Sequence, residues 1–233
     1  MHDGVPEVSG SLTVWNRIGK ATGDDAISLR ILEFGPGVSP VLSNRGCDEV
    51  LYVLEGSCTV VIDGNTYEVA PETGIYVRPG QTWSVENSGP DLVRIVSSQC
   101  PELHEATASK QVTPIVRLSD RRALPTADRW YRVLVDQDMG SEQVTQFVGS
   151  IPPGRAPDHF HEYEEVLFIL RGEGRMWAGE SNTPIGPGSC IYLPRRQVHC
   201  VENTGTGELR LLGVFYPAGS PAVRYETTDE HGS

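Results

Sequence analysis

An internal repeat limits the fold of this 233-residue chain more than any other feature of its sequence. The stretch DEVLYVLEG at 48–56 matches EEVLFILRG at 164–172, and WSVENSG at 83–89 matches HCVENTG at 199–205. Both pairs are separated by 116 residues, and the short runs IYV and IYL share that offset. One earlier match, LEFGPG with GSIPPG, has an offset of 117 residues. Self-similarity at a fixed spacing predicts two copies of one folding unit.

Each copy consists of short runs rich in Val, Ile, Leu, Tyr and Phe, separated by turn pairs such as DG and PG. This spacing is typical of an antiparallel sandwich or small barrel. We therefore predict an all-β chain of two barrel domains. The expected limits are 10–98 for the N-terminal domain, 99–128 for a connector, 129–217 for the C-terminal domain and 218–233 for a tail.

Two polar segments fall outside the repeated runs. The stretch RLSDRRALPTADRW at 117–130 contains several arginines, which we interpret as a solvated face packed between the domains. A ligand-binding patch is the alternative. The final segment, 227–233, is expected to be frayed, as chain ends without packing partners usually are.

The charge and composition exclude several classes of partner. A formal charge of -12 and a pI near 4.9 argue against nucleic acid and anionic membranes, which require basic surfaces. No run approaches the roughly 18 apolar residues of a membrane span, and the N-terminus lacks the basic and apolar regions of a secretory signal. The five cysteines are scattered without a C-x-x-C pair, which indicates reduced thiols in a cytoplasmic protein. A small molecule is the expected partner, and edge strands would allow a homodimer.

The stretch HFHEYEE at the start of a strand-like run contains the main candidates for chemistry. Side chains alternate between the two faces of a strand, so His159, His161 and Glu165 are expected on one face. Glu162 and Glu164 should point the other way. Two imidazoles and one carboxylate suit Fe(II), Mn(II), Zn(II), Ni(II) or Cu(II) better than calcium.

A fourth donor, His199, lies in the last strong strand signal, with Val201 on the same face. A lone histidine there would more often be structural, but the first cluster favours a ligand. Leu167 and Ile169 continue the face of the cluster as an apolar wall. The site would then have polar ligands at one end and a hydrophobic chamber behind them.

These segments resemble the two motifs of the cupin family. HFHEYEEVLFILRG is similar to the first motif, and GSCIYLPRRQVHCVEN is similar to the second. The chain departs from the pattern at Arg196, where the family usually has glycine, and at Gly154, which lies one residue closer to His159 than is commonest. The resemblance implies a bicupin with two jelly-roll barrels and a C-terminal metal site formed by His159, His161, Glu165 and His199.

Further residues are expected around this site. The candidate pocket residues are Phe147, Arg155, Leu167, Ile169, Trp177, Tyr192 and Val201. Arg155 and Asp158 flank the ligand strand and would lie near the mouth, whereas Trp177 could face either side. Tyr192 has Tyr76 as its counterpart in the repeat, which favours a packing role. No side chain is identified as a catalytic acid or base.

The repeat also provides an internal control for the metal site. An offset of 116 places Ser43, Arg45, Glu49 and Trp83 at the ligand positions of the N-terminal copy. Arginine stays protonated and indole offers no lone pair, so this copy should hold no metal. Glu49 could pair with Arg45 and Trp83 could fill the vacated volume. The alternative is a second small-molecule pocket with Arg45 as an anion clamp.

The ligand set implied by the resemblance would leave open positions on one divalent transition metal, with Fe(II) favoured. An oxygenase acting on a small chelated substrate is the first hypothesis. The second is non-redox catalysis: isomerisation, cyclisation, decarboxylation or hydrolysis of a small metabolite. A non-catalytic storage or effector-binding cupin is the third.

Overall fold

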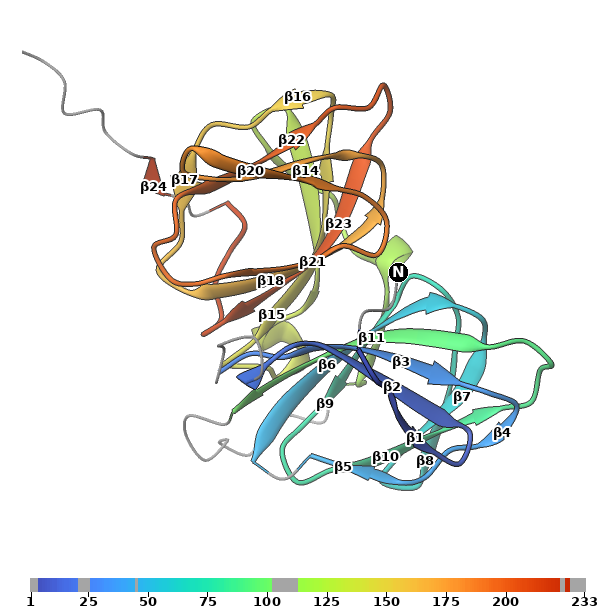
Figure 1. Ribbon diagram of the computed structural model, residues 1–233. Helices are drawn as coiled ribbons and strands as arrows, with labels where there is room; N and C mark the ends of the chain where they lie inside the picture. Colours follow the sequence, from blue (N-terminus) through green and yellow to red (C-terminus); the bar gives the residue numbers. More distant parts are fainter. Residues whose placement is uncertain (1–3, 21–25, 45, 102–112, 223–224, 227–233) are drawn as a thin grey trace, which may run out of the picture.

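The computed structural model describes residues 4–20, 26–44, 46–101, 113–222 and 225–226. Strands dominate these residues, and they form two barrels that lie one above the other in the view of Figure 1. Each barrel consists of two facing antiparallel sheets. The predicted fold class, two all-β jelly-roll barrels in one chain, is confirmed.

The N-terminal barrel is built by β1 to β12. A seven-stranded sheet in the order β1-β2-β3-β11-β6-β9-β12 faces a five-stranded sheet of β4, β10, β7, β8 and β5. The bounds are β1 (Glu7–Ser9), β2 (Leu12–Ile18), β3 (Leu29–Phe34), β4 (Gly37–Val38), β5 (Leu42–Ser43), β6 (Cys47–Glu55), β7 (Cys58–Ile62), β8 (Asn65–Val69), β9 (Thr73–Val77), β10 (Thr82–Asn87), β11 (Val93–Pro101) and β12 (Ile115–Arg117).

The C-terminal barrel repeats this plan with β13 to β24. The order β13-β14-β15-β23-β18-β21 forms one sheet, and β20-β19-β22-β17-β24, with β16 beside β22, forms the other. The bounds are β13 (Leu124–Thr126), β14 (Arg129–Val135), β15 (Thr145–Ile151), β16 (Gly154–Arg155), β17 (His159–Phe160), β18 (Glu164–Arg171), β19 (Gly174–Ala178), β20 (Ser181–Ile185), β21 (Cys190–Leu193), β22 (His199–Asn203), β23 (Leu209–Tyr216) and β24 (Tyr225–Glu226). Two short 3-10 helices, η2 (Leu118–Asp120) and η3 (Gln137–Met139), complete the described elements.

The structural repeat includes strands that have no recognisable sequence match between the two copies. β1 and β2 correspond to β13 and β14 at an offset of 117, although no sequence match marks these strands. From β6 and β18 onward the offset is 116. The segment expected as a connector contributes a strand to each barrel, because β12 pairs with β9 and β13 pairs with β14. The domain limits expected from the sequence, 10–98 and 129–217, leave out β12 and β13 and therefore remain a proposal.

Alternation of side chains explains why β6 and β18 are apolar on both faces. Leu51 belongs to the interior core of the N-terminal barrel, whereas its neighbours Val50 and Tyr52 belong to a core that both barrels share. Val166 and Phe168 on β18 contribute to this shared core from the other side. The two barrels therefore bury a common hydrophobic surface, which stabilises their association within the chain.

The segment after β23 returns to the C-terminal barrel. β24 pairs with β17, and Tyr163 donates a hydrogen bond to the carbonyl of Ser220 at 2.7 Å. Residues 227–233, which the sequence predicts to be frayed, lie outside the described residues. Among the described residues, no helix has the length and apolar character needed to cross a membrane.

Candidate metal centre

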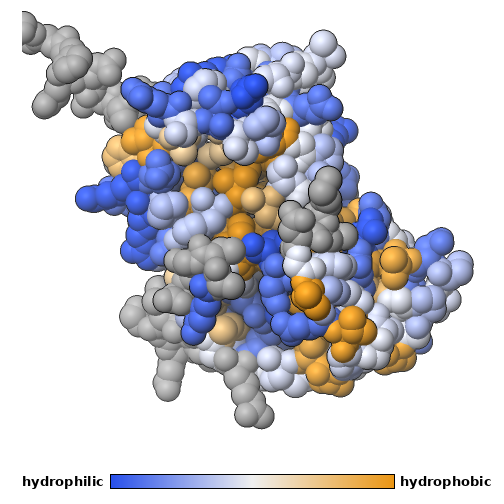
Figure 2. Space-filling model, in the orientation of Figure 1, coloured by the Kyte–Doolittle hydropathy of each residue, from blue (hydrophilic) through white to orange (hydrophobic). Residues whose placement is uncertain are grey.

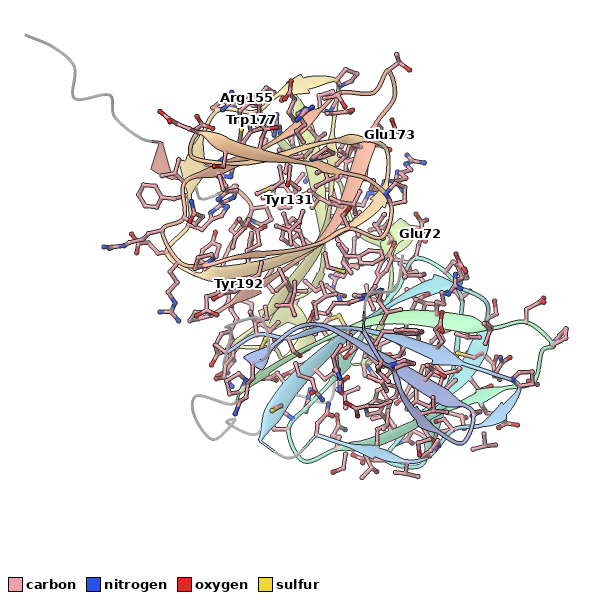
Figure 3. The ribbon with its side chains drawn as sticks, viewed as in Figure 1. Glu72, Tyr131, Arg155, Glu173, Trp177 and Tyr192 are labelled. Carbon is pink, nitrogen blue, oxygen red and sulfur yellow. The ribbon has the colours of Figure 1, made fainter. Side chains whose placement is uncertain are left out.

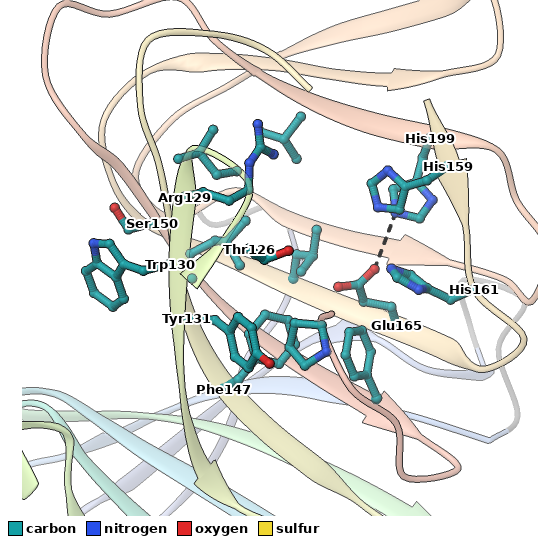
Figure 4. A pocket seen from close by; sticks show the side chains of 17 residues that line it. Thr126, Arg129, Trp130, Tyr131, Phe147, Ser150, His159, His161, Glu165 and His199 are labelled. Atoms are coloured by element: carbon teal, nitrogen blue, oxygen red, sulfur yellow. Dashed lines mark ion pairs between the residues drawn. The ribbon is translucent and has the colours of Figure 1, made fainter. Parts of the chain in front are cut away.

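Three histidines converge inside the C-terminal barrel. His159 and His199 face each other across the β17–β22 ladder, and His161 follows in the turn after β17. One ring nitrogen of each histidine lies within 4.8 Å of the corresponding atoms of the other two. Figure 4 shows the three rings and Glu165 gathered on one side of the pocket. This grouping is compact enough for the histidines to share one metal ion.

Backbone hydrogen bonds set the orientation of two rings. His199 Nδ1 lies 2.7 Å from the carbonyl of Gln197, and His159 Nδ1 lies 3.0 Å from the carbonyl of Pro157. A carbonyl only accepts, so each Nδ1 carries the proton and Nε2 is the unprotonated atom. Burial and the neighbouring His159 lower the pKa of His199 to about 4. A neutral imidazole with its second nitrogen held in this way is the form that binds metals.

Glu165 completes the group, and one of its two carboxyl oxygens makes no hydrogen bond to the described residues. Its Oε2 atom is buried, lies 3.5 Å from His199 Nε2 and accepts no hydrogen bond within the described part of the chain. Burial raises the pKa of this carboxyl to about 8. An isolated buried carboxylate is costly unless a cation neutralises it. The donor set therefore fits a divalent cation, which would neutralise Glu165 and accept the three imidazole nitrogens.

The N-terminal barrel shows how the same glutamate is satisfied without a metal. Glu49 is buried and accepts hydrogen bonds from four side chains. Three of its donors lie on β3 and β11: Arg30 at 2.5 Å, Ser97 at 2.5 Å and Gln99 at 3.3 Å. The fourth is the indole nitrogen of Trp83, at 3.2 Å. Arg30 supplies the positive charge that balances this carboxylate.

Each of these donors is exchanged at the equivalent position around Glu165. The cross-strand ladders place Phe147 where Arg30 stands, Gly213 where Ser97 stands, Phe215 where Gln99 stands and His199 where Trp83 stands. The first three replacements have no side-chain hydrogen-bond donor. The C-terminal glutamate thus has Phe147 in place of the arginine and His199 in place of the tryptophan, and its burial raises its pKa.

The ladders correct two of the counterparts assigned from the sequence. Leu42 lies opposite Trp83 just as His159 lies opposite His199, so Leu42 and not Ser43 is the counterpart of His159. The carbonyls of Asn44 and His161 accept equivalent backbone hydrogen bonds, which makes Asn44 the counterpart of His161. The uniform offset fails here because the N-terminal copy has one more residue before its glutamate. Arg45, expected to pair with Glu49, lies outside the described residues.

The turn at Arg196 keeps the conformation that the family pattern gives to glycine. Arg196 has φ of 63°, and its amide donates to the carbonyl of His161 at 2.7 Å. Gly80 occupies the equivalent place in the N-terminal barrel, with φ of 82°. The Arg196 side chain pairs with Glu162, and Arg195 lies 3.6 Å from Glu164, so both acids are directed away from the histidines. The departure from glycine therefore leaves the turn beside the ligands intact.

A cavity of about 100 Å³ opens beside the histidines and Glu165. Three pocket residues expected from the sequence, Phe147, Leu167 and Val201, line it. Gly213 makes room for Phe147, since a Cβ atom there would collide with the phenyl ring. On the face seen in Figure 2, hydrophobic residues gather in the middle of the C-terminal barrel and are framed by hydrophilic ones. The cavity is small and mainly apolar, below the roughly 300–1,000 Å³ of sites for drug-sized ligands.

The other expected pocket residues lie elsewhere. Ile169 is fully buried in the barrel core but does not border the cavity. Tyr192 packs against the core shared by the two barrels. Figure 3 shows Arg155 and Trp177 together at the top of the C-terminal barrel, away from the N-terminal barrel. The Arg155 guanidinium lies 4.1 Å from the centre of the indole ring. Trp177 also donates to Glu202, so strand alternation turns it outward.

Sequence reasoning missed several residues of the site. Tyr163 lies in the bend between β17 and β18 and stacks on His161 with ring centres 4.9 Å apart; its place two residues after His161 was the available signal. Phe215 packs against Phe147 at 4.8 Å, within an apolar run that carries no distinguishing signal. Arg129 lines the cavity but falls in the segment interpreted as a solvated face.

Comparison with known proteins agrees with this architecture. A family model described as a cupin domain matches residues 30–98 and again residues 147–215. A glyoxylate-induced protein of Pseudomonas aeruginosa has a similar structure, with a TM-score of 0.79 and 17% identity over 93% of this chain and 86% of the other. Oxalate decarboxylase of Bacillus subtilis is similar with a TM-score of 0.78 and 13% identity, over 97% of this chain and 78% of the other.

Curated relatives match shorter stretches. An oxalate-binding protein of Thermotoga maritima is 36% identical over 67 residues, which cover 28% of this chain and 55% of the relative. Auxin-binding protein 1 of Arabidopsis thaliana is 31% identical over 86 residues, which cover 33% of this chain and 43% of the relative. The chain therefore spans about half the length of the curated relatives it matches.

Proposed function

Because the chain belongs to the cupin family, with a cupin domain in each half, we propose that it is an enzyme that converts a small organic anion at one metal ion. The metal would be held by His159, His161, Glu165 and His199 in the C-terminal barrel. The N-terminal barrel would support this site through the core that both barrels share.

One observation carries the proposal. The buried Glu165 has Phe147 at the place where its counterpart Glu49 has the neutralising Arg30. A buried carboxylate that has lost its cation should destabilise the barrel unless another cation replaces it. Three imidazole nitrogens surround the place where such a cation would bind.

A bound divalent ion would act as a Lewis acid that polarises an oxygen atom of the substrate. The protein would contribute in three further ways. The carbonyls of Pro157 and Gln197 hold two histidines in the metal-binding tautomer. Phe147 and Phe215 exclude water from one side of the cavity, which strengthens electrostatic interactions inside it. The small volume restricts the substrate to a few carbon atoms.

The similar proteins favour a small carboxylic acid as the substrate. Those named above include an oxalate decarboxylase and an oxalate-binding protein, and no oxygenase. We therefore place a decarboxylation or isomerisation, which consumes no external oxidant, before the oxygenase expected from the sequence. Mn(II) joins Fe(II) as a leading metal candidate, since the Bacillus subtilis enzyme is described with Mn(II) centres.

Removal of dioxygen separates the two reaction classes. We expect protein loaded with Mn(II) or Fe(II) to convert a member of a panel of two- to four-carbon hydroxy and oxo acids equally fast in air and under nitrogen. Product formation followed by NMR, together with an oxygen electrode, provides the measurement. The Glu165→Gln variant, which keeps the shape of the side chain but removes its charge, should be inactive under both conditions. Turnover that occurs only in air, with matching oxygen uptake, would instead establish an oxygenase.

A further inference from the structure

Arg129 lines the metal cavity from the side opposite the histidines. It is the one lysine or arginine that borders this cavity within the described residues. Figure 4 shows Arg129 and Thr126 across the pocket from His159, His199 and Glu165. The charge at this position is unexpected, because the lining of the cavity as a whole is mainly apolar.

The repeat shows that Arg129 occupies an interior position of the barrel. Leu12 pairs with Ser9 at the start of β2, and Arg129 pairs with Thr126 at the start of β14 in the same way. Leu12 is 2% exposed and belongs to the interior core that contains Trp83, the counterpart of His199. The C-terminal barrel thus has an arginine where the N-terminal barrel has a core leucine.

The β13–β14 hairpin binds the Arg129 guanidinium at its Nε edge and leaves the edge with the two terminal nitrogens open. Asp128 accepts a hydrogen bond from Arg129 Nε at 3.1 Å, and the Arg129 side chain is 14% exposed. Neither terminal nitrogen of the guanidinium has a hydrogen-bond partner among the described residues. Two parallel N–H groups of this kind match the geometry of a carboxylate. The ion pair with the largely exposed Asp128 balances this charge from one side, and a ligand carboxylate at the terminal nitrogens would add a second charged partner.

We propose that Arg129 binds a second carboxylate of the substrate, at the end away from the metal. This inference rests on the proposed function, and it narrows the substrate class to short dicarboxylic hydroxy or oxo acids. One end of the acid would bind at the metal, and the distal carboxylate would accept two hydrogen bonds from the Arg129 guanidinium. Thr126, beside Arg129 on the hairpin, would add a hydroxyl to the same end of the cavity.

The test compares two acids that differ only at the distal end. L-Malate and 2-hydroxybutyrate share the metal-binding hydroxy acid group, but only malate has a second carboxylate. Isothermal titration calorimetry of Mn(II)-loaded protein should show that malate binds roughly 10 to 100 times more tightly, as charge-assisted hydrogen bonds to a carboxylate imply. The Arg129→Leu variant copies the residue of the N-terminal barrel, so its interior should remain packed. It should lose this preference and bind 2-hydroxybutyrate unchanged.

Two controls distinguish the possible failures. Arg175→Gln, on an exposed residue of β19, should keep the preference for malate. The metal content of every sample is measured before titration, since Arg129→Leu should retain one metal per chain. Equal binding of the two acids by the unmodified protein, or a preference that persists in Arg129→Leu, would overturn the role of Arg129 and leave the metal site intact. Absence of bound metal in the unmodified protein would instead refute the proposed function.

Discussion

We expect the His161→Ala and His199→Ala variants to retain less than about a tenth of a metal ion per chain, against about one for the unmodified protein. Loss of a hydrogen-bond partner behind a ligand already weakens metal binding by roughly 10 to 100-fold, and loss of the ligand itself should cost more. Both histidines are buried, and their ring centres lie 5.5 Å apart. An alanine at either position has no side-chain atom that could bind the metal in place of the imidazole. Elemental analysis after loading with Mn(II) and desalting provides the measurement.

The matched control for this experiment is Arg175→Ala on the exposed face of β19, which should bind metal as the unmodified protein does. Circular dichroism establishes that each variant is folded. Metal content that stays near one ion per chain in both histidine variants would rule out the site described above.

The second large effect is expected at Trp83 in the N-terminal barrel. Trp83→Ala should lower the free energy of unfolding by about 3–5 kcal/mol, the usual cost of removing a buried aromatic side chain. Trp83 is 1% exposed, packs on Phe34 with ring centres 6.2 Å apart and donates to Glu49. Denaturant titration gives the stability change, and elemental analysis should still give about one metal per chain.

Trp177→Ala serves as the comparison, because Trp177 stacks on Arg155 at the outer face of the other barrel. Its loss should cost much less than the loss of Trp83. A binding stoichiometry near two metals per chain in the unmodified protein would contradict the assignment of the metal to one barrel. An unchanged stability of Trp83→Ala would contradict its role as core filling.

The sequence predicts the fold because the repeat and the turn pairs are visible without the structure, whereas the ligand group stays a prediction. The repeat identifies two β units. Strand parity predicts one strand face for His159, His161 and Glu165, but β17 and β18 belong to facing sheets and His161 lies in the bend between them, so these side chains converge from two sheets. The β17–β22 ladder pairs His159 with His199, and Glu165 Oε2 from the facing sheet lies 3.5 Å from His199 Nε2. The N-terminal counterparts of His159 and His161 could not be assigned correctly from the sequence. The N-terminal copy has one more residue before Glu49, and a single offset of 116 does not detect such a difference in loop length. Ser43 and Arg45 were assigned for this reason, whereas the ladders select Leu42 and Asn44.

The partners of the two glutamates could not be predicted from the sequence. Arg30 and Phe147 lie 19 and 18 residues from the carboxylates they flank, and only the pairing of β3 with β11 and of β15 with β23 brings them near. Arg129 was missed for a similar reason. Its segment has no apolar alternation, and its interior position follows only from the equivalence of β14 with β2.

Anomalous diffraction from a crystal of the protein soaked in Mn(II) tests the central claim most directly. The exchange of Arg30 for Phe147 predicts one strong anomalous peak per chain, bounded by the imidazoles of His159, His161 and His199 and the carboxylate of Glu165. A crystal that shows no peak among these four side chains, or a peak beside Glu49 instead, would contradict the assignment of the metal centre.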